Sequence, residues 1–202
     1  MMLNYITLQN ELFMTFEAMN SVYNNGDEYM ATRIANAITN YIYSGTITTV
    51  DTAKTIDNDD YVGKGVGKMM INEIYLRNGL LNVFVSKNND FELARRIAYE
   101  IDTVCTVNNT CSIVTQGYTI QEPSIPYYGN GIGNFRSSNN IIFSRLKNCY
   151  DAMKHMSLNG NMYLAQEWAL GVDEYLKFGT VSVDINLAIP ISGTGNGSGK
   201  IS

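Results

Sequence analysis

Apolar residues recur along the chain with the spacing of helices that bury one side. The clearest example lies in 28–44, where the apolar positions are Met30, Ile34, Ala37, Ile38, Tyr41 and Ile42. A matching stripe in 162–178 consists of Leu164, Trp168, Val172, Tyr175 and Leu176. Steps of three and four residues place such side chains on one face of a helix. We expect helices over 7–24, 28–44, 70–87, 91–106, 140–158 and 162–178, with each consecutive pair forming an αα-hairpin.

After the last of these stretches, the apolar residues recur at every second position instead. They are Val181, Val183, Ile185, Leu187 and Ile189, and they alternate with polar or small residues. This alternation predicts a strand with one buried face. Weaker versions begin at Ile47 and Ile113. Each of these two is followed by a variable segment that we expect to be a surface loop.

Three glycine-rich hexapeptides stand at equal spacing in the chain. They begin at residues 63, 129 and 195, so each lies 66 residues after the one before it. Their glycines are Gly63, Gly65, Gly67, Gly129, Gly131, Gly133, Gly195, Gly197 and Gly199. Matching patterns at equal spacing predict three tandem copies of one unit. We interpret the motifs as tight backbone runs that need glycine either for a positive φ or for close approach to another chain. We expect them to act in packing or assembly, with Ile201 as the apolar anchor of the C-terminal motif.

The second helix of each predicted unit carries two alanines one turn apart. They are Ala31 and Ala35, Ala94 and Ala98, and Ala165 and Ala169. Residues four apart lie on the same face of a helix. Because alanine is small, we predict an equivalent close helix contact in each unit.

Together these patterns predict an α+β fold, mostly helical, with three tandem repeats of helix–helix–strand, each followed by a Gly-x-Gly-x-Gly segment. The predicted units are residues 1–69, 70–135 and 136–202. A unit of this size buries too little surface to be comfortably stable alone. We therefore expect the units to pack on one another or on partners.

Composition narrows the classes of function. Only 16% of the residues are charged, against about 25% in typical soluble domains, while 24 are asparagine and 14 are tyrosine. Such a surface suits contact with neighbouring proteins, although the nucleotide bias of an AT-rich genome enriches the same residues. The net charge of −5, without a basic run, argues against nucleic-acid binding. We also expect no membrane span and no signal peptide.

The first glycine motif has some likeness to a phosphate-binding loop. Gly63–Lys68 ends in a Gly-Lys pair. A Walker loop, however, requires glycine at the position of Val62 and Ser or Thr at that of Met69. We predict a protein that is not an enzyme, and a nucleotide- or small-molecule-binding enzyme that uses the 63–68 loop stays as an alternative.

Cysteine and histidine spacing gives little support for a metal site. Five residues separate Cys105 from Cys111 and Cys149 from His155, whereas zinc ligands usually stand closer together. Cys105 also aligns with Ile42 on an apolar stripe, where a thiol acts as a small apolar side chain. We predict no metal, no cofactor, no catalytic residue and three reduced thiols.

One resemblance suggests a biological setting. The segment from Ile34 to Ile47 joins an Ala-rich helix to a Gly-Thr-Ile strand start, and Gly-Thr-Gly-Asn-Gly-Ser-Gly-Lys-Ile-Ser stands at 193–202. This unit resembles small virion structural proteins of tailed bacteriophages, here in three copies. The resemblance implies a structural role in a virion, in the tail, neck or baseplate more than in capsid decoration.

The same resemblance implies that the partners are other virion proteins, and copies of this chain in a symmetric assembly. It also implies synthesis in the host cytoplasm and a final location in the virion. A fused repeat can occupy several equivalent sites of a symmetric particle at high effective concentration. A glycan- or receptor-binding adhesin, in which tyrosines line the sugar sites, is the other alternative.

Overall fold

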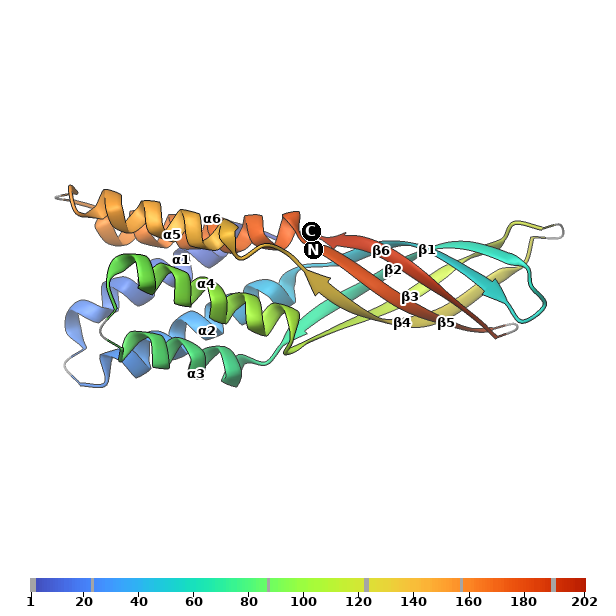
Figure 1. Ribbon diagram of the computed structural model, residues 1–202, viewed down its shortest axis with the longest axis horizontal. Coiled ribbons are helices and arrows are strands. Elements are labelled where there is room, and N and C mark those ends of the chain that lie inside the picture. Colours follow the sequence, from blue (N-terminus) through green and yellow to red (C-terminus); the bar gives the residue numbers. More distant parts are fainter. Residues whose placement is uncertain (1–2, 23, 87, 122–123, 157, 190–191) are drawn as a thin grey trace.

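The computed structural model describes residues 3–22, 24–86, 88–121, 124–156, 158–189 and 192–202. Within these residues the chain forms two helices followed by two strands, and this order occurs three times. The helices gather at one end of an elongated molecule and the strands at the other (Figure 1). The helices are α1 (Tyr5–Ala18), α2 (Gly26–Ser44), α3 (Glu73–Phe84), α4 (Asp90–Thr106), α5 (Asn140–Met153) and α6 (Gly160–Phe178), with a short 3-10 helix, η1 (Met19–Ser21), after α1.

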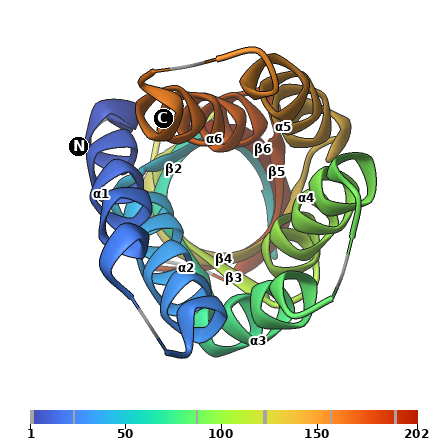
Figure 2. The same cartoon turned by 90° about the vertical axis from the view of Figure 1, so that its left-hand side faces the viewer.

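The helices stand side by side in a closed ring, in which α6 contacts both α5 and α1 (Figure 2). Asparagine occupies the N-cap of every α-helix in the described residues: Asn4, Asn25, Asn72, Asn89, Asn139 and Asn159. The side chains of Asn4, Asn72 and Asn89 accept a hydrogen bond from an amide of the first turn, as good N-caps do. Asn25 and Asn159 instead adopt the left-handed backbone, at φ 55° and 61°, which asparagine tolerates. Helix starts therefore account for part of the high asparagine content.

The strands form one closed antiparallel barrel. They are β1 (Ile47–Thr55), β2 (Asp60–Ile71), β3 (Asn109–Thr119), β4 (Pro126–Arg136), β5 (Thr180–Ile189) and β6 (Gly193–Ile201). The strand β6 pairs with both β5 and β1, and Ile201 lies opposite Ile47. The backbones of Thr46 and Ser202 exchange hydrogen bonds of 2.8 and 2.9 Å. The C-terminal glycine motif is therefore the strand that closes the barrel.

The narrow barrel interior explains the glycines. Eight strands enclose a space just wide enough for side chains to fill, and six strands enclose less. The strands β1, β3 and β5 send mostly side chains inward, whereas β2, β4 and β6 place their motif glycines there. A Cβ atom added at any of these nine glycines would lie less than 3.0 Å from another atom. Close approach is the reason for glycine here, since none of the glycines in the described residues has a positive φ.

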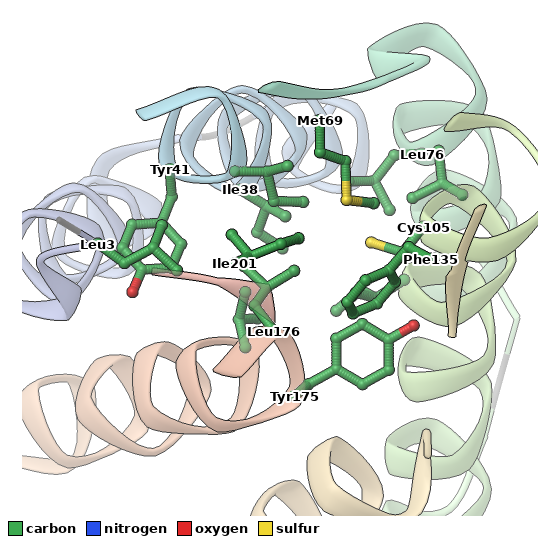
Figure 3. Close-up of a cluster of buried hydrophobic side chains, with 14 of the residues drawn as sticks. Leu3, Ile38, Tyr41, Met69, Leu76, Cys105, Phe135, Tyr175, Leu176 and Ile201 are labelled. Atoms are coloured by element: carbon green, nitrogen blue, oxygen red, sulfur yellow. The ribbon is translucent and has the colours of Figure 1, made fainter. Parts of the chain in front are cut away.

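Apolar side chains from the barrel and the helices form one core where the two parts meet (Figure 3). Met69, Phe135 and Ile201 each follow the last glycine of a motif by two residues, and all three are buried. They converge with Ile38 of α2 and Leu176 of α6 on the same region. Burying a side chain of this size stabilises the fold by about 1.5–3 kcal/mol. This layer therefore couples the barrel to the helix ring.

The predicted fold class is wrong. Each glycine motif is itself a strand, and the strands of all three stretches join in a single closed barrel instead of three helix–helix–strand repeats. Glycine is depleted in strands in general, so local sequence patterns contained little sign of β2, β4 and β6. The helices overlap the stretches expected from the apolar stripes, and β5 coincides with the alternating stretch.

Candidate interaction surface

The large apolar side chains on the outer face of the barrel gather on one half, where they stand among polar residues such as Lys64, Gln116 and Asn130. The large apolar side chains exposed on the strands all belong to β1–β4, and they are Val50, Val62, Val66, Met70, Val114, Tyr118, Tyr128 and Ile132. The outward positions of β5 and β6 within the described residues are Thr180, Ser182, Asp184, Asn186, Ala188, Thr194, Asn196, Ser198 and Lys200. We call the first set the apolar face. Contiguous exposed apolar surface is uncommon on monomeric proteins and marks interaction sites.

Strand register brings the members of the apolar face into contact. Val66 of β2 lies opposite Val114 of β3, and Val62 lies opposite Tyr118. Ile132 of β4 lies opposite Ser112 of β3 and diagonal to Val114 on the same outer face, within reach of a large side chain. Ile132 is also the most exposed apolar residue of the strands, at 70%. The face is therefore continuous across neighbouring strands.

A groove of about 390 Å³ crosses the distal part of this face. One bank is the register row Val50, Lys64, Gln116 and Tyr128, and the other is the row Val62, Tyr118 and Pro126. Gly63 and Gly117 lie opposite each other between the two rows and form its floor. The groove combines two aromatic rings with the polar heads of Lys64 and Gln116. Lys64 makes no ion pair with any other described residue, which leaves its charge free for a partner.

The nine motif glycines lie at inward positions of β2, β4 and β6, and Ile201 is 2% exposed at the end of β6. The glycines of the 195–199 motif pair with β1 and β5 of the same chain. These residues therefore shape the barrel of this chain. The residues that alternate with the glycines along the same strands are the ones that face outward.

The 63–68 segment is part of β2, whose backbone pairs with β1 and β3, so it is an extended strand and not a loop before a helix. The Lys68 ammonium donates to the carbonyl oxygens of Tyr43, Ser44 and Gly45 at 3.2, 3.2 and 2.8 Å. These carbonyls stand at the C-terminal end of α2, where the helix dipole attracts a cation. Lys68 therefore caps a helix.

The predicted alanine pairs all lie in the second helix of a hairpin. Ala31 and Ala35 of α2, Ala94 and Ala98 of α4, and Ala165 and Ala169 of α6 are each at most 1% exposed. The close helix contact at these alanines stays a prediction, and their burial agrees with it.

The three cysteines are buried and free. Burial raises the pKa of the Cys111 thiol to about 11 and that of Cys149, with a smaller effect of Glu167, to about 12. Cys111 lies in β3 and Cys149 in α5. Within the described residues no three His, Cys, Asp or Glu side chains come close enough to hold a metal ion.

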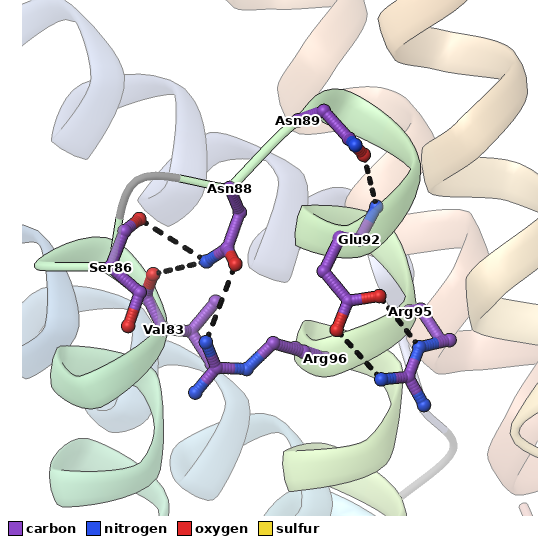
Figure 4. A network of polar contacts seen from close by, with 7 residues as sticks. All are labelled: Val83, Ser86, Asn88, Asn89, Glu92, Arg95 and Arg96. Atoms are coloured by element: carbon purple, nitrogen blue, oxygen red, sulfur yellow. Dashed lines mark hydrogen bonds and ion pairs between the residues drawn. The ribbon is translucent and has the colours of Figure 1, made fainter.

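Polar contacts at the far end of the ring tie α3 to α4 (Figure 4). The Asn88 amide donates to the carbonyl oxygens of Val83 and Ser86 at 2.9 and 3.2 Å, and the Arg96 guanidinium reaches the Asn88 oxygen at 3.4 Å. On the outside of α4, Arg95 pairs with Glu92 at 2.7 Å. These bonds fix a turn between two helices.

Hydrogen bonds and ion pairs between residues far apart in the sequence connect helices of the ring. The Tyr41 hydroxyl of α2 donates to Asp173 of α6, and the Tyr175 hydroxyl donates to Asp102 of α4 at 2.7 Å. Arg145 of α5 forms ion pairs with Glu167 and Glu174 of α6. All of these side chains have partners within the protein, and none of them lines the groove of the barrel.

Sequence reasoning missed two features, the apolar face and a group of polar side chains inside the barrel. Asp51 is 0% exposed and lies at an inward position of β1, where Ile47 and Thr49 precede it on the same side. The alternation that starts at Ile47 would have placed Asp51 inside a strand. The exposed residues of β2 and β4 could not be identified, because the motifs were not recognised as strands.

Comparisons with known protein families, with curated proteins and with solved structures give no match. None of the helices in the described part of the chain combines the length and apolar character needed to cross a membrane.

Proposed function

We propose that this protein is a non-enzymatic structural component of a tailed-phage virion, in the tail, neck or baseplate, and that it docks through its apolar face. The observation that carries the proposal is the division of the barrel surface. Strands β1–β4 expose valine, isoleucine, methionine and tyrosine among polar residues, whereas the described outward positions of β5 and β6 carry small or polar side chains. Such one-sided exposure fits a contact with a neighbouring protein.

The partner we expect presents apolar side chains with a carboxylate opposite Lys64. The valines and Ile132 of the apolar face would lose contact with water, and the unpaired Lys64 ammonium would meet an opposite charge at the rim. An apolar centre with a charged rim is the usual anatomy of a protein interface, and the rim charge contributes to specificity and on-rate. Other virion proteins, and copies of this acidic chain, are the candidate partners.

The virion setting is supported by the resemblance of the Gly-Thr-Gly-Asn-Gly-Ser-Gly-Lys-Ile-Ser segment and its preceding helix to small virion proteins of tailed phages. Symmetric particles also offer repeated sites to a chain in which one order of elements occurs three times.

The test uses a charge on each half of the barrel. The double variant Val114→Asp/Ile132→Asp places carboxylates on the apolar face, and Ser182→Asp is the matched control on the polar half. All three positions point outward, so circular dichroism and the melting temperature should stay close to those of the unchanged protein. We expect the double variant to be lost from purified particles, as measured by mass spectrometry, while Ser182→Asp incorporates normally. Normal incorporation of the double variant would overturn docking through this face.

A glycan-binding adhesin is a second candidate, favoured by one observation. Tyr118 and Tyr128 flank the groove and are 61% and 50% exposed, and aromatic rings beside polar groups suit a sugar. Glycan-array binding that disappears in Tyr118→Ala, together with absence of the chain from particles, would favour this function over the structural one.

A further inference from the structure

Beneath the groove, the barrel encloses buried oxygen atoms that docking does not use. Thr49, Asp51 and Tyr127 are 3%, 0% and 0% exposed. Among the described residues, no hydrogen-bond partner reaches the Thr49 hydroxyl, either oxygen of the Asp51 carboxylate or the Tyr127 hydroxyl. Buried polar groups are nearly always satisfied, so this group of atoms requires an explanation.

Register places these side chains at one region of the interior. Asp51 lies opposite Gly63 of β2 and Gly197 of β6, and the space that a side chain at Gly197 would take is filled by its carboxylate. A Cβ atom at Gly65 would approach both the Thr49 hydroxyl and the Asp51 carboxylate, so these two groups flank the same glycine.

Two further hydroxyls adjoin this region. The Tyr61 and Thr115 hydroxyls share a hydrogen bond of 2.9 Å, and the Tyr61 and Tyr127 rings meet edge to face with centroids 6.3 Å apart. A Cβ atom added at Gly63, the residue opposite Asp51, would run into the Tyr61 hydroxyl. The Tyr61 hydroxyl and Asp51 therefore lie at the same level of the barrel interior.

We propose that this oxygen cluster, formed by Thr49, Asp51, Tyr61, Thr115 and Tyr127, binds one monovalent metal cation, sodium or potassium. Every donor is an oxygen, which suits hard cations. The single carboxylate balances one positive charge, whereas a divalent ion would leave a net charge in the interior, where it is strongly unfavourable. The oxygens of Thr49, Asp51 and Tyr127 have no hydrogen-bond partner among the described residues, as expected of oxygens that face a bound cation from different sides, whereas Tyr61 and Thr115 hydrogen-bond to each other as neighbouring ligands.

The site would fix the floor of the groove. Gly63 and Gly117 form that floor, and the register row that contains them continues to Asp51 on one side and Tyr127 on the other. A cation held between the two ends of this row would tie β1 to β4 across the barrel interior.

Thermal unfolding in different salts tests the proposal on the full chain. The melting temperature is measured in sodium, potassium and choline chloride at one ionic strength, so that screening is the same. Choline is too large for the barrel interior. A ligand that binds only the folded state raises the melting temperature by mass action. We expect a rise of several degrees in sodium or potassium relative to choline, and the better cation identifies the occupant.

The variant Asp51→Asn keeps the shape and removes the charge, and Asp184→Asn makes the same change on the outside of β5. We expect Asp51→Asn to melt at the same temperature in all three salts and Asp184→Asn to keep the dependence. The proposal would be overturned if the protein without substitutions has the same melting temperature in all three salts. It would also be overturned if the melting temperature of Asp51→Asn still depends on the cation.

A crystal soaked in thallium(I), which replaces these ions, supplies a readout that needs no variant. An anomalous peak beside the Asp51 carboxylate would support the site. If thallium fills other sites in the crystal but gives no peak beside Asp51, the proposal is contradicted.

Discussion

The same substitution, glycine to alanine, should have opposite effects in the two halves of this molecule. Gly199 of β6 faces the barrel interior, and an added Cβ atom would run into the backbone carbonyl oxygen of Thr48 on the paired strand β1. A strand carbonyl in a closed barrel cannot move without breaking its ladder. Overpacking of this kind costs about 1–3 kcal/mol, and we expect Gly199→Ala at the upper end, about 3 kcal/mol.

Two other glycines complete a graded series. At Gly133 the nearest atom is a methyl of Val181, 2.9 Å from the added Cβ, and a side chain can yield, so we expect a cost of about 1 kcal/mol. Gly171 lies inside α6, where the nearest atoms outside that helix are 3.6 Å away, an ordinary contact. Alanine favours a helix interior over glycine by about 0.5–1 kcal/mol, so Gly171→Ala should stabilise the protein.

Urea unfolding followed by circular dichroism measures the series, with an unchanged m-value as the check that only stability has changed. For a chain of this length, 1 kcal/mol shifts the melting temperature by about 2–4 °C. Gly199→Ala should therefore melt roughly 10 °C lower and Gly171→Ala a few degrees higher. If Gly199→Ala is as stable as the unchanged protein, the register that closes the barrel is wrong.

Three further predictions concern single side chains. Lys68→Ala should lower the free energy of unfolding by about 1 kcal/mol through loss of the α2 cap, whereas Lys64→Ala, at an exposed position, should leave it unchanged. Millimolar ATP should leave the melting temperature of both variants unchanged, and a clear shift with ATP would contradict the helix-capping role. Since burial holds the pKa of Cys149 at about 12, a thiol reagent at pH 8 should label it only after urea unfolds the chain, and rapid native labelling would show that α5 is not packed. Lys147 and Lys154 lower the pKa of Asp151 to about 2. The ion pairs of Asp151 should therefore contribute fully to stability above about pH 4, and that contribution should be lost as the pH falls towards 2. A midpoint near pH 4 in an NMR titration of the carboxyl group would contradict those pairs.

The helices of this fold can be read from the sequence because their signals are local. The stripe through Ile34 and Ile38, and its partner through Trp168 and Val172, need only the period of a helix. The alternation from Val181 to Ile189 is equally local, and it marks β5 without knowledge of the rest of the chain.

The barrel could not be predicted in the same way, because its glycines are explained only by a neighbouring chain segment. Gly67 and Gly199 are required by the carbonyls of Ser112 and Thr48, and neither contact is visible before strand pairing is known. The glycines themselves were compatible with a positive φ or with close approach of another backbone, and their regular spacing indicated a repeat. Neither could indicate that the approaching segments were strands of one barrel.

The apolar face was missed for a related reason. Val66 and Ile132 stand between the glycines of two motifs, and Val62 directly precedes the first glycine of its motif. They point outward only because β2 and β4 are strands whose glycines point inward. The interior position of Asp51 follows from the same rule applied to β1. The proposed docking surface thus depends on strand pairing, the structural feature that local patterns did not supply.

The most direct test of the account is a cryo-electron microscopy map of the purified particle that contains this chain. The account predicts density for the barrel and helix ring in the tail, neck or baseplate, with β1–β4 packed against a neighbouring protein and a carboxylate near Lys64. The polar half, β5 and β6, should be the side less covered. A chain absent from the particle, or a barrel whose apolar face lies open to solvent while the polar half makes the contacts, would contradict the central claim.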